Sequence, residues 1–205
     1  MKKIIFILVI IILLIGCSNE EKISPTEDNS VVISPSELFV GDTKKLEPHM
    51  DLTTGSVKVN YSGDKKYISI KYEIWENGES TKENVILTSI IKNGFNGELS
   101  FSIKKLVNDE LKTMESMKMT SVISTDNGYS TSSTYIDRIP TGYSYGPTEL
   151  DEEIKVQDDG DIIIWGIRAS KDGRSTYYND INRTLISADL ALVLMLEFKD
   201  DIENE

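Results

Sequence analysis

Histidine and carboxylate side chains are the groups of this chain that could transfer protons in a catalytic reaction. His49 is the only histidine, so an imidazole base would have to be this residue. It lies beside Pro48, and no zinc-binding His-Glu-x-x-His motif is present. One histidine cannot supply the usual ligands of a catalytic zinc ion. We therefore interpret His49 as a surface loop residue, and we predict a protein without a catalytic residue, metal or cofactor, which is not an enzyme.

Carboxylates alone could still hydrolyse a glycan, because that chemistry needs only two acids held about 5 to 9 Å apart. The chain has 34 acidic residues, so such pairs arise by number alone. The run Asp158-Asp159-Gly160-Asp161 offers the oxygen ligands that calcium prefers, but it lacks the EF-hand spacing. Asp-Gly is also a common hairpin turn, so we predict a turn there, with calcium binding as the alternative.

Tyrosines are the side chains that point to recognition. Tyr129, Tyr135, Tyr143 and Tyr145 lie among Ser, Thr and Gly in residues 124–147, which we expect to form one long irregular loop. An exposed tyrosine offers a flat apolar face and a hydroxyl group at a low entropic cost, which suits a protein or glycan partner. Because glycines flank Tyr143 and Tyr145, we predict that these two are exposed and bind such a partner. The alternative is that the rings cover sheet edges or pack inward, and part of the segment, residues 131–139, could pair as an edge strand.

The single cysteine, Cys17, ends an apolar N-terminal segment. Two lysines precede an unbroken apolar run over residues 4–15, which is shorter than the roughly 20 residues of a transmembrane helix. A basic start followed by a short apolar run is typical of a secretory signal. The run ends in Leu14-Ile15-Gly16-Cys17, which resembles the lipobox of bacterial lipoproteins.

This resemblance implies that the Cys17 thiol carries a diacylglycerol and that the chain is cut after Gly16. Residues 1–16 would then be a signal peptide, and the protein would be anchored by lipid to the cell membrane on its extracytoplasmic face. Residues 17–30 are polar and acidic with one aliphatic residue, so we expect a flexible tether there. The alternative is a short membrane anchor that happens to end in Gly-Cys.

The charge of the chain excludes one class of partner. The formal net charge is −12, and no basic stripe is present to neutralise phosphates, so we expect no nucleic acid to bind. With one cysteine no intramolecular disulfide can form. Residues 31–205 are long enough to build one substantial core, which must therefore be held by packing and hydrogen bonds alone.

Short strands separated by turns must position these residues. Polar and apolar side chains alternate over residues 67–75, and Asn77-Gly78 follows, so we predict a hairpin with a return strand over residues 84–92. Residues 162–169 are apolar on both faces, which indicates a central strand, and we predict a second hairpin that pairs it with residues 153–156.

Other segments are less regular. Residues 44–47 and 55–61 are candidate strands, and residues 105–111 could be a helical turn or a loop. We interpret the methionine cluster as core residues, although such clusters also mark adaptable binding surfaces. Its members are Met114, Met117 and Met119. Residues 185–199 fit an apolar helix, but the alternation of Leu and Phe favours a strand.

The sequence thus predicts an all-β chain that folds as a single β-sandwich over residues 31–205, and an immunoglobulin-like arrangement is one form of it. For function, we predict a lipid-anchored extracytoplasmic lipoprotein that acts as a binding or structural module of the cell envelope. The alternative is an enzyme that acts on envelope glycans through carboxylates.

Overall fold

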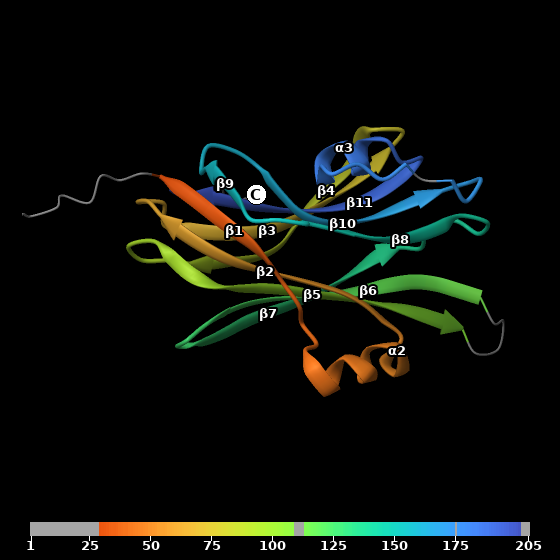
Figure 1. Ribbon diagram of the computed structural model, residues 1–205, viewed down its shortest axis with the longest axis horizontal. Coiled ribbons are helices and arrows are strands. Elements are labelled where there is room, and N and C mark those ends of the chain that lie inside the picture. Colours follow the sequence, from red (N-terminus) through yellow and green to blue (C-terminus); the bar gives the residue numbers. More distant parts are fainter. Residues whose placement is uncertain (1–28, 109–112, 175, 202–205) are drawn as a thin grey trace, which may run out of the picture.

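The computed structural model describes residues 29–108, 113–174 and 176–201. Two antiparallel sheets pack face to face, so the predicted β-sandwich is confirmed (Figure 1). Cys17, the signal peptide and nearly all of the tether lie outside the described residues. The elements are, in order, β1 (Ser30–Ser36), η1 (Gly41–Leu46), α2 (Glu47–Met50), β2 (Leu52–Ser62), β3 (Tyr67–Glu76), β4 (Glu79–Ile90), β5 (Phe95–Asn108), β6 (Thr113–Thr125), β7 (Gly128–Asp137), β8 (Ser144–Glu149), β9 (Ile154–Gln157), β10 (Ile162–Ser170), α3 (Ile181–Ile186) and β11 (Leu190–Lys199).

The two sheets contain six and five strands. The six-stranded sheet has the order β7-β6-β5-β2-β1-β9, and the five-stranded sheet has the order β4-β3-β11-β10-β8. In an immunoglobulin domain the C-terminal strand lies at a sheet edge. Here β11 lies in the middle of its sheet, between β3 and β10, so the strand order differs from the immunoglobulin arrangement.

The core lies between the sheets and is built by the alternation that the sequence predicts. Ile68 and Ile70 of β3 are fully buried, as is Leu99 of β5. Trp165 of β10 packs against Phe101 of β5, with ring centroids 5.7 Å apart. Met117 and Met119 are also buried in this cluster, so their interpretation as core residues is confirmed.

The outer face of the five-stranded sheet carries a second, smaller apolar cluster. Val193 and Met195 of β11 pack there with Leu185 of α3. The strand prediction for residues 185–199 is confirmed for residues 190–199, whereas residues 185 and 186 belong to the short helix. β10 is central and buried on both faces, as predicted.

The first predicted hairpin is confirmed. Asn77 and Gly78 have φ angles of 52° and 83°, the left-handed pair that a two-residue turn requires. β3 and β4 pair antiparallel on either side of this turn. β4 begins directly after it, at Glu79, earlier than the return strand that the sequence predicts.

The second predicted hairpin is wrong, because β9 and β10 belong to different sheets. β9 pairs with β1, and β10 pairs with β11 and β8. The acidic turn between them is fixed to the N-terminal end of β1, since the Asp158 amide donates to the Asn29 carbonyl at 3.1 Å. The buried Tyr61 hydroxyl also donates to Asp158 Oδ2 at 2.6 Å. These bonds direct the chain from one sheet to the other.

Three further expectations are corrected. Residues 44–47 belong to η1 and α2, because the Thr43 side chain closes a tight turn on Val40 and Pro48 lies in the first turn of α2. Residues 105–108 continue β5, where they pair with β6. Residues 124–147 are mostly β7 and β8, so the long loop is wrong, whereas an edge strand there is confirmed as β7.

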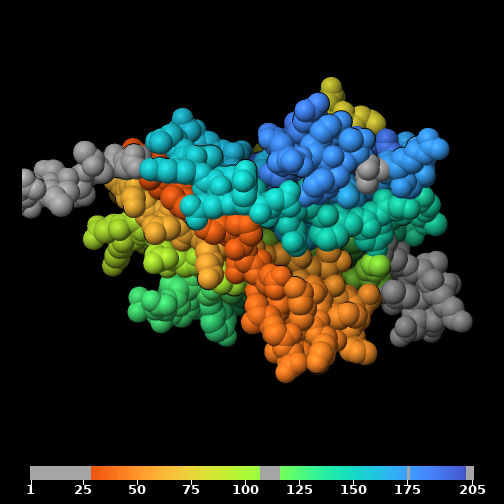
Figure 2. All heavy atoms as spheres, in the orientation of Figure 1, coloured from red at the N-terminus to blue at the C-terminus, as the bar shows by residue number. Residues whose placement is uncertain are grey.

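The two helical segments lie on opposite sides of the sandwich. η1 and α2 project from the six-stranded sheet, and α3 lies on the five-stranded sheet (Figures 1 and 2). No helix among the described residues is long and apolar enough to cross a bilayer.

Candidate functional site

The outer face of the six-stranded sheet presents an ordered array of hydroxyl groups. The strand register places Ser124, Glu98, Lys58 and Ser34 in one row across four strands. Parallel rows pair Val122 with Ser100 and Thr120 with Ser102. We call this surface the hydroxyl face, and its Ser and Thr residues are Ser34, Ser36, Thr54, Ser56, Ser100, Ser102, Thr120, Ser124, Thr131 and Ser133.

The array arises from the same alternation that builds the core. On β6, Met117, Met119 and Ile123 point inward, so the residues between them must point outward. Neighbouring strands lie about 4.8 Å apart, and residues on one face repeat about every 6.7 Å along a strand. The hydroxyl groups therefore form a regular grid of donors and acceptors, in which Ser56 and Ser100 are buried and the others are at least partly accessible.

Some of these hydroxyl groups are held in place by neighbours. Ser56 Oγ donates to Glu98 Oε1 at 2.8 Å, and Ser34 Oγ donates to Glu153 Oε2 at 2.7 Å. The hydroxyls of Thr120 and Ser133 are 2.9 Å apart. Thr131 and Ser133 are exposed, so at the β7 side the grid is open to solvent.

Two tyrosines project from β7 at this open side. Tyr129 is 76% exposed and Tyr135 is 66% exposed, the highest values among the aromatic residues that the structure describes. They stand on the same face as Thr131 and Ser133, opposite Ser124 and Lys118 of β6. The two residues are six positions apart along the strand, so their rings are roughly 20 Å apart.

Tyr143 and Tyr145 lie elsewhere and differ from expectation. Both are half-buried and pack against the core, so the prediction that they are the exposed pair is wrong. Lysines cover their rings, with Lys105 Nζ 5.0 Å from the Tyr145 centroid and Lys171 Nζ 5.8 Å from that of Tyr143. A role of these two residues in binding stays a prediction. The spacing that identifies the exposed pair, alternate Tyr, Thr, Ser and Tyr on β7, is present in the sequence.

The chemistry-bearing residues singled out by sequence are separated in the structure. His49 is exposed on α2. In the acidic turn, Asp158 accepts from Tyr61, and Asp161 Oδ2 lies 2.5 Å from the buried Lys71 Nζ. Within the described ranges no group of three or more His, Cys, Asp or Glu side chains is placed to hold a metal ion.

One serine pattern was missed by sequence reasoning. Residues 142–146 read Gly-Tyr-Ser-Tyr-Gly, which matches the Gly-x-Ser-x-Gly pattern of hydrolases. In those enzymes the serine lies on a sharp turn between a strand and a helix. Here Ser144 is the first residue of β8 and pairs with Ser170 of β10, so the fold does not provide that context.

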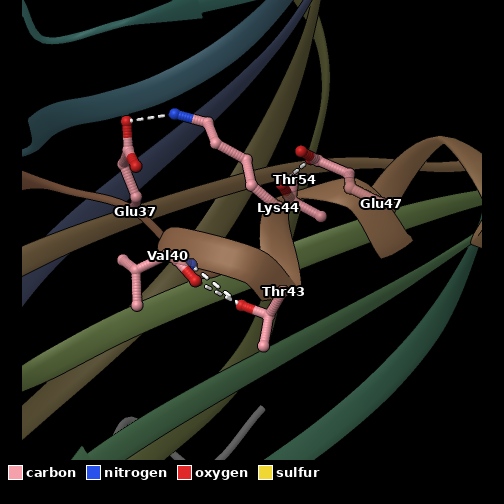
Figure 3. Close-up of polar contacts among 6 residues, drawn as sticks. All are labelled: Glu37, Val40, Thr43, Lys44, Glu47 and Thr54. Atoms are coloured by element: carbon pink, nitrogen blue, oxygen red, sulfur yellow. Dashed lines mark hydrogen bonds and ion pairs between the residues drawn. The ribbon is translucent and has the colours of Figure 1, made fainter.

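A cavity of about 390 Å³ lies between β2, β8 and the segment that leads into α2. Glu37, Glu47 and Glu149 line it with Lys44. Lys44 Nζ is 2.7 Å from Glu37 Oε1, and the Thr54 hydroxyl donates to Glu47, as Figure 3 shows. We call it the Glu149 cavity.

Glu149 has an unusual environment. The indole Nε1–H of the buried Trp165 donates to its Oε1 at 3.3 Å. Burial raises the pKa of the Glu149 carboxyl above its ordinary value, and the charges of Glu47 and Glu37 act in the same direction against the hydrogen bond from Trp165. Glu149 as a whole residue is exposed, but the partial desolvation of its carboxyl makes it easier to protonate than usual.

A hollow of about 940 Å³ lies over the outer face of the five-stranded sheet. Trp75, Ile163 and Met195 contribute apolar surface to it. No lysine or arginine is found among the described residues that line it. One of its carboxylates, Asp161, is already paired with the buried Lys71. Its carboxylates belong to Glu73, Glu149, Asp151, Glu152, Asp159, Asp161 and Asp180.

Comparison with known proteins adds no assignment: no family model, curated protein or solved structure matches the chain. The function must therefore be argued from these surfaces and from the N-terminal motif.

Proposed function

We propose that the protein is a lipid-anchored lipoprotein on the extracytoplasmic side of the cell membrane, and that its hydroxyl face binds a glycan of the cell envelope. The observation that carries the proposal is the placement of Tyr129 and Tyr135 on the outer face of one strand, beside a grid of Ser and Thr hydroxyls. Sugars offer apolar ring faces that stack on aromatic rings and hydroxyl groups that pair with such a grid.

A glycan fits this face better than a protein partner does. Protein interfaces have an apolar centre with a polar rim. The hydroxyl face has a different pattern, because Ser and Thr residues and the charged Lys58 and Glu98 occupy its middle and the tyrosines stand on its edge strand. The distance of roughly 20 Å between the two rings would let them stack on separate units of one extended chain.

Co-sedimentation tests the proposal. The full chain in detergent micelles is mixed with insoluble peptidoglycan, and the bound fraction is measured against protein concentration. The double variant Tyr129→Ala, Tyr135→Ala is expected to bind at least about tenfold more weakly, because an aromatic hot spot contributes about 2 kcal/mol.

Tyr177→Ala is the matched control for this experiment. Tyr177 is 49% exposed but lies away from β7. Its hydroxyl donates to Asp151 Oδ2 at 2.6 Å. The Tyr177→Ala variant should bind peptidoglycan as tightly as the unsubstituted chain does. Equal sedimentation of the double variant and the unsubstituted chain would remove the hydroxyl face from the proposal.

The second candidate function is a carboxylate-dependent enzyme that acts on the same glycans. The upward shift of the Glu149 pKa, in a cavity that also holds Glu47, favours it, because the acid of a catalytic carboxylate pair is the one whose surroundings raise its pKa. The same sedimentation experiment separates the two functions. A binding module leaves the glycan intact, whereas an enzyme releases soluble reducing sugars into the supernatant, and Glu149→Gln abolishes that release.

The anchoring part of the proposal rests on the lipobox-like ending at Cys17. Cys17→Ser should abolish labelling of the chain by radioactive palmitate and shift the protein out of the membrane fraction, because the thiol is the acceptor of the lipid. Ser18→Ala, which leaves the motif intact, should be labelled and sediment with membranes. Labelling of the Cys17→Ser chain at the unsubstituted level would disprove the anchor.

A further inference from the structure

A second cavity opens between the two sheets on the side where β4 faces β7. It has a volume of about 400 Å³, within the range of small-molecule sites in proteins. Both sheets contribute apolar side chains to its wall, among them Met117, Ile136, Ile167 and Leu192. Each of these four is at most 4% exposed, so the wall belongs to the interior of the sandwich.

The cavity exists because β4 does not complete the core along its first half. Residues 79–85, at the start of this edge strand, are all exposed. Their register against β3 shifts between Ile74 and Trp75. Only farther along β4 do Ile86 and Leu87 pack against the core. On β10, in the same sheet as β4, Ala169 presents only a small side chain to the core, which leaves the space unfilled.

The mouth of the cavity is charged. Glu76, Lys82, Asp137 and Arg138 stand around it. Lys82 Nζ lies 3.2 Å from Asp137 Oδ2, which connects β4 to β7 across the opening. The side chains of Lys82 and Asp137 are 45% and 88% exposed, so water competes for this pair and it contributes little to stability. A ligand with an anionic end could therefore take the place of Asp137 beside Lys82.

We propose that this cavity binds one linear aliphatic chain that ends in a carboxylate, with the chain between the sheets and the carboxylate beside Lys82. The apolar wall favours an aliphatic chain over a peptide or a second copy of the protein, since Met117, Ile136, Ile167 and Leu192 are buried rather than displayed on a face. Lys82 on β4 and Arg138 after β7 stand at the mouth beside the acids Glu76 and Asp137, so a ligand carboxylate would replace Asp137 as the partner of Lys82.

Photocrosslinking tests this site in the full chain. The protein is held in phospholipid nanodiscs and exposed to a palmitate analogue that carries a diazirine in mid-chain, and the labelled peptides are identified by mass spectrometry. Labelling is expected on β7 and β11 around Ile136 and Leu192, and a tenfold excess of palmitate should suppress it at least about fivefold. Labels spread over the surface, or labels that palmitate does not displace, would overturn the site.

Two variants probe the two halves of the site. Ala169→Leu fills the cavity and should lose the displaceable label. Lys82→Glu reverses the charge at the mouth and should weaken competition by palmitate at least about fivefold while competition by hexadecanol stays the same. Lys65→Glu is the matched control, because Lys65 forms an ion pair of the same kind with Asp200, at 2.7 Å, away from the cavity.

The outcomes separate the parts of the proposal. If Ala169→Leu keeps the near-ultraviolet circular dichroism of the folded chain and is still labelled normally, the cavity is not the site. If that variant does not fold, the Lys82→Glu variant and the map of labelled peptides decide whether the cavity is the binding site. If hexadecanol and palmitate compete equally well for the unsubstituted chain, the proposal that the ligand ends in a carboxylate is wrong.

Discussion

Glu149 and Trp165 show how a core side chain sets the chemistry of a carboxylate near the surface. The indole of Trp165 is 1% exposed, so its N–H must find an acceptor within the protein. Glu149 supplies that acceptor, and the position that this bond requires brings its carboxylate into the partly enclosed space that Glu37 and Glu47 also line. Burial of the carboxyl in this space raises the pKa of Glu149, while the hydrogen bond from Trp165 lowers it.

The raised pKa of Glu149 predicts how the stability of the fold depends on pH. The folded state binds the Glu149 proton more tightly than the unfolded state does, so the contribution of this group to folding is fully present below its unfolded pKa and is lost as the pH rises through its folded pKa. Glu149→Gln keeps the acceptor for Trp165 but does not titrate. Its melting temperature should therefore rise relative to that of the unsubstituted chain as the pH increases from about 4 to 7. Thermal melts across this range measure the difference, and parallel curves would contradict it.

The tyrosines show which features of single residues can be predicted from the sequence and which cannot. Their composition and polar neighbours mark residues 124–147 as a candidate binding region, and the two exposed rings do belong to that region. Which rings face outward depends on where β7 begins and on its pairing with β6, because a shift by one residue exchanges the two faces. Glycine neighbours are a weaker guide than this alternation, so the expectation for Tyr143 and Tyr145 failed.

Among the elements, β2 and β10 approach each other closely across the core. A Cβ atom added at Gly55 of β2 would lie 2.3 Å from the Trp165 indole of β10. Only glycine allows this contact without displacing the ring. The position of Trp165, and with it the hydrogen bond to Glu149, therefore depends on the absence of a side chain at residue 55.

Gly55→Ala should destabilise the fold by about 1–3 kcal/mol, the cost of overpacking a well-filled core. Gly146→Ala is the matched control, because a Cβ there meets no atom within 4 Å. It should change the free energy of unfolding by less than about 0.5 kcal/mol. Urea denaturation of the two variants measures both values, and a Gly55→Ala chain as stable as the control would refute the close approach.

Strand pairing divides the elements into those that sequence predicts and those that it does not. The β3–β4 hairpin follows from Asn77-Gly78, a local signal that is sufficient by itself. The turn at residues 158–161 looks equally local, yet β9 pairs with β1, far away in the sequence. That choice depends on the bonds of Asp158 to Asn29 and Tyr61, which no local pattern encodes.

For the whole molecule, alternation predicts the layers but not their order. Short strands with one apolar face must pack in pairs of sheets, which is why the sandwich could be predicted. The strand order depends on contacts between distant segments, such as the pairing of β11 with β3. The grid on the outer face is equally inaccessible to local reasoning, because its rows exist only once β1, β2, β5 and β6 are aligned.

This architecture predicts an uneven distribution of stability. β11 is hydrogen-bonded on both sides and buried on both faces, whereas β4 and β7 are edge strands with many exposed residues. Amide hydrogen exchange should be slowest in β11 and faster by several orders of magnitude in the first half of β4. Exchange followed by mass spectrometry measures both segments, and equal protection would contradict the model of a loosely closed edge.

The central place of β11 also bears on the order of events during biosynthesis. Its partners β3 and β10 are made earlier, but they cannot be bridged until residues 190–199 have left the ribosome. Contacts between such distant segments form slowly. A nascent polypeptide of this design cannot complete its five-stranded sheet until β11 has been synthesised.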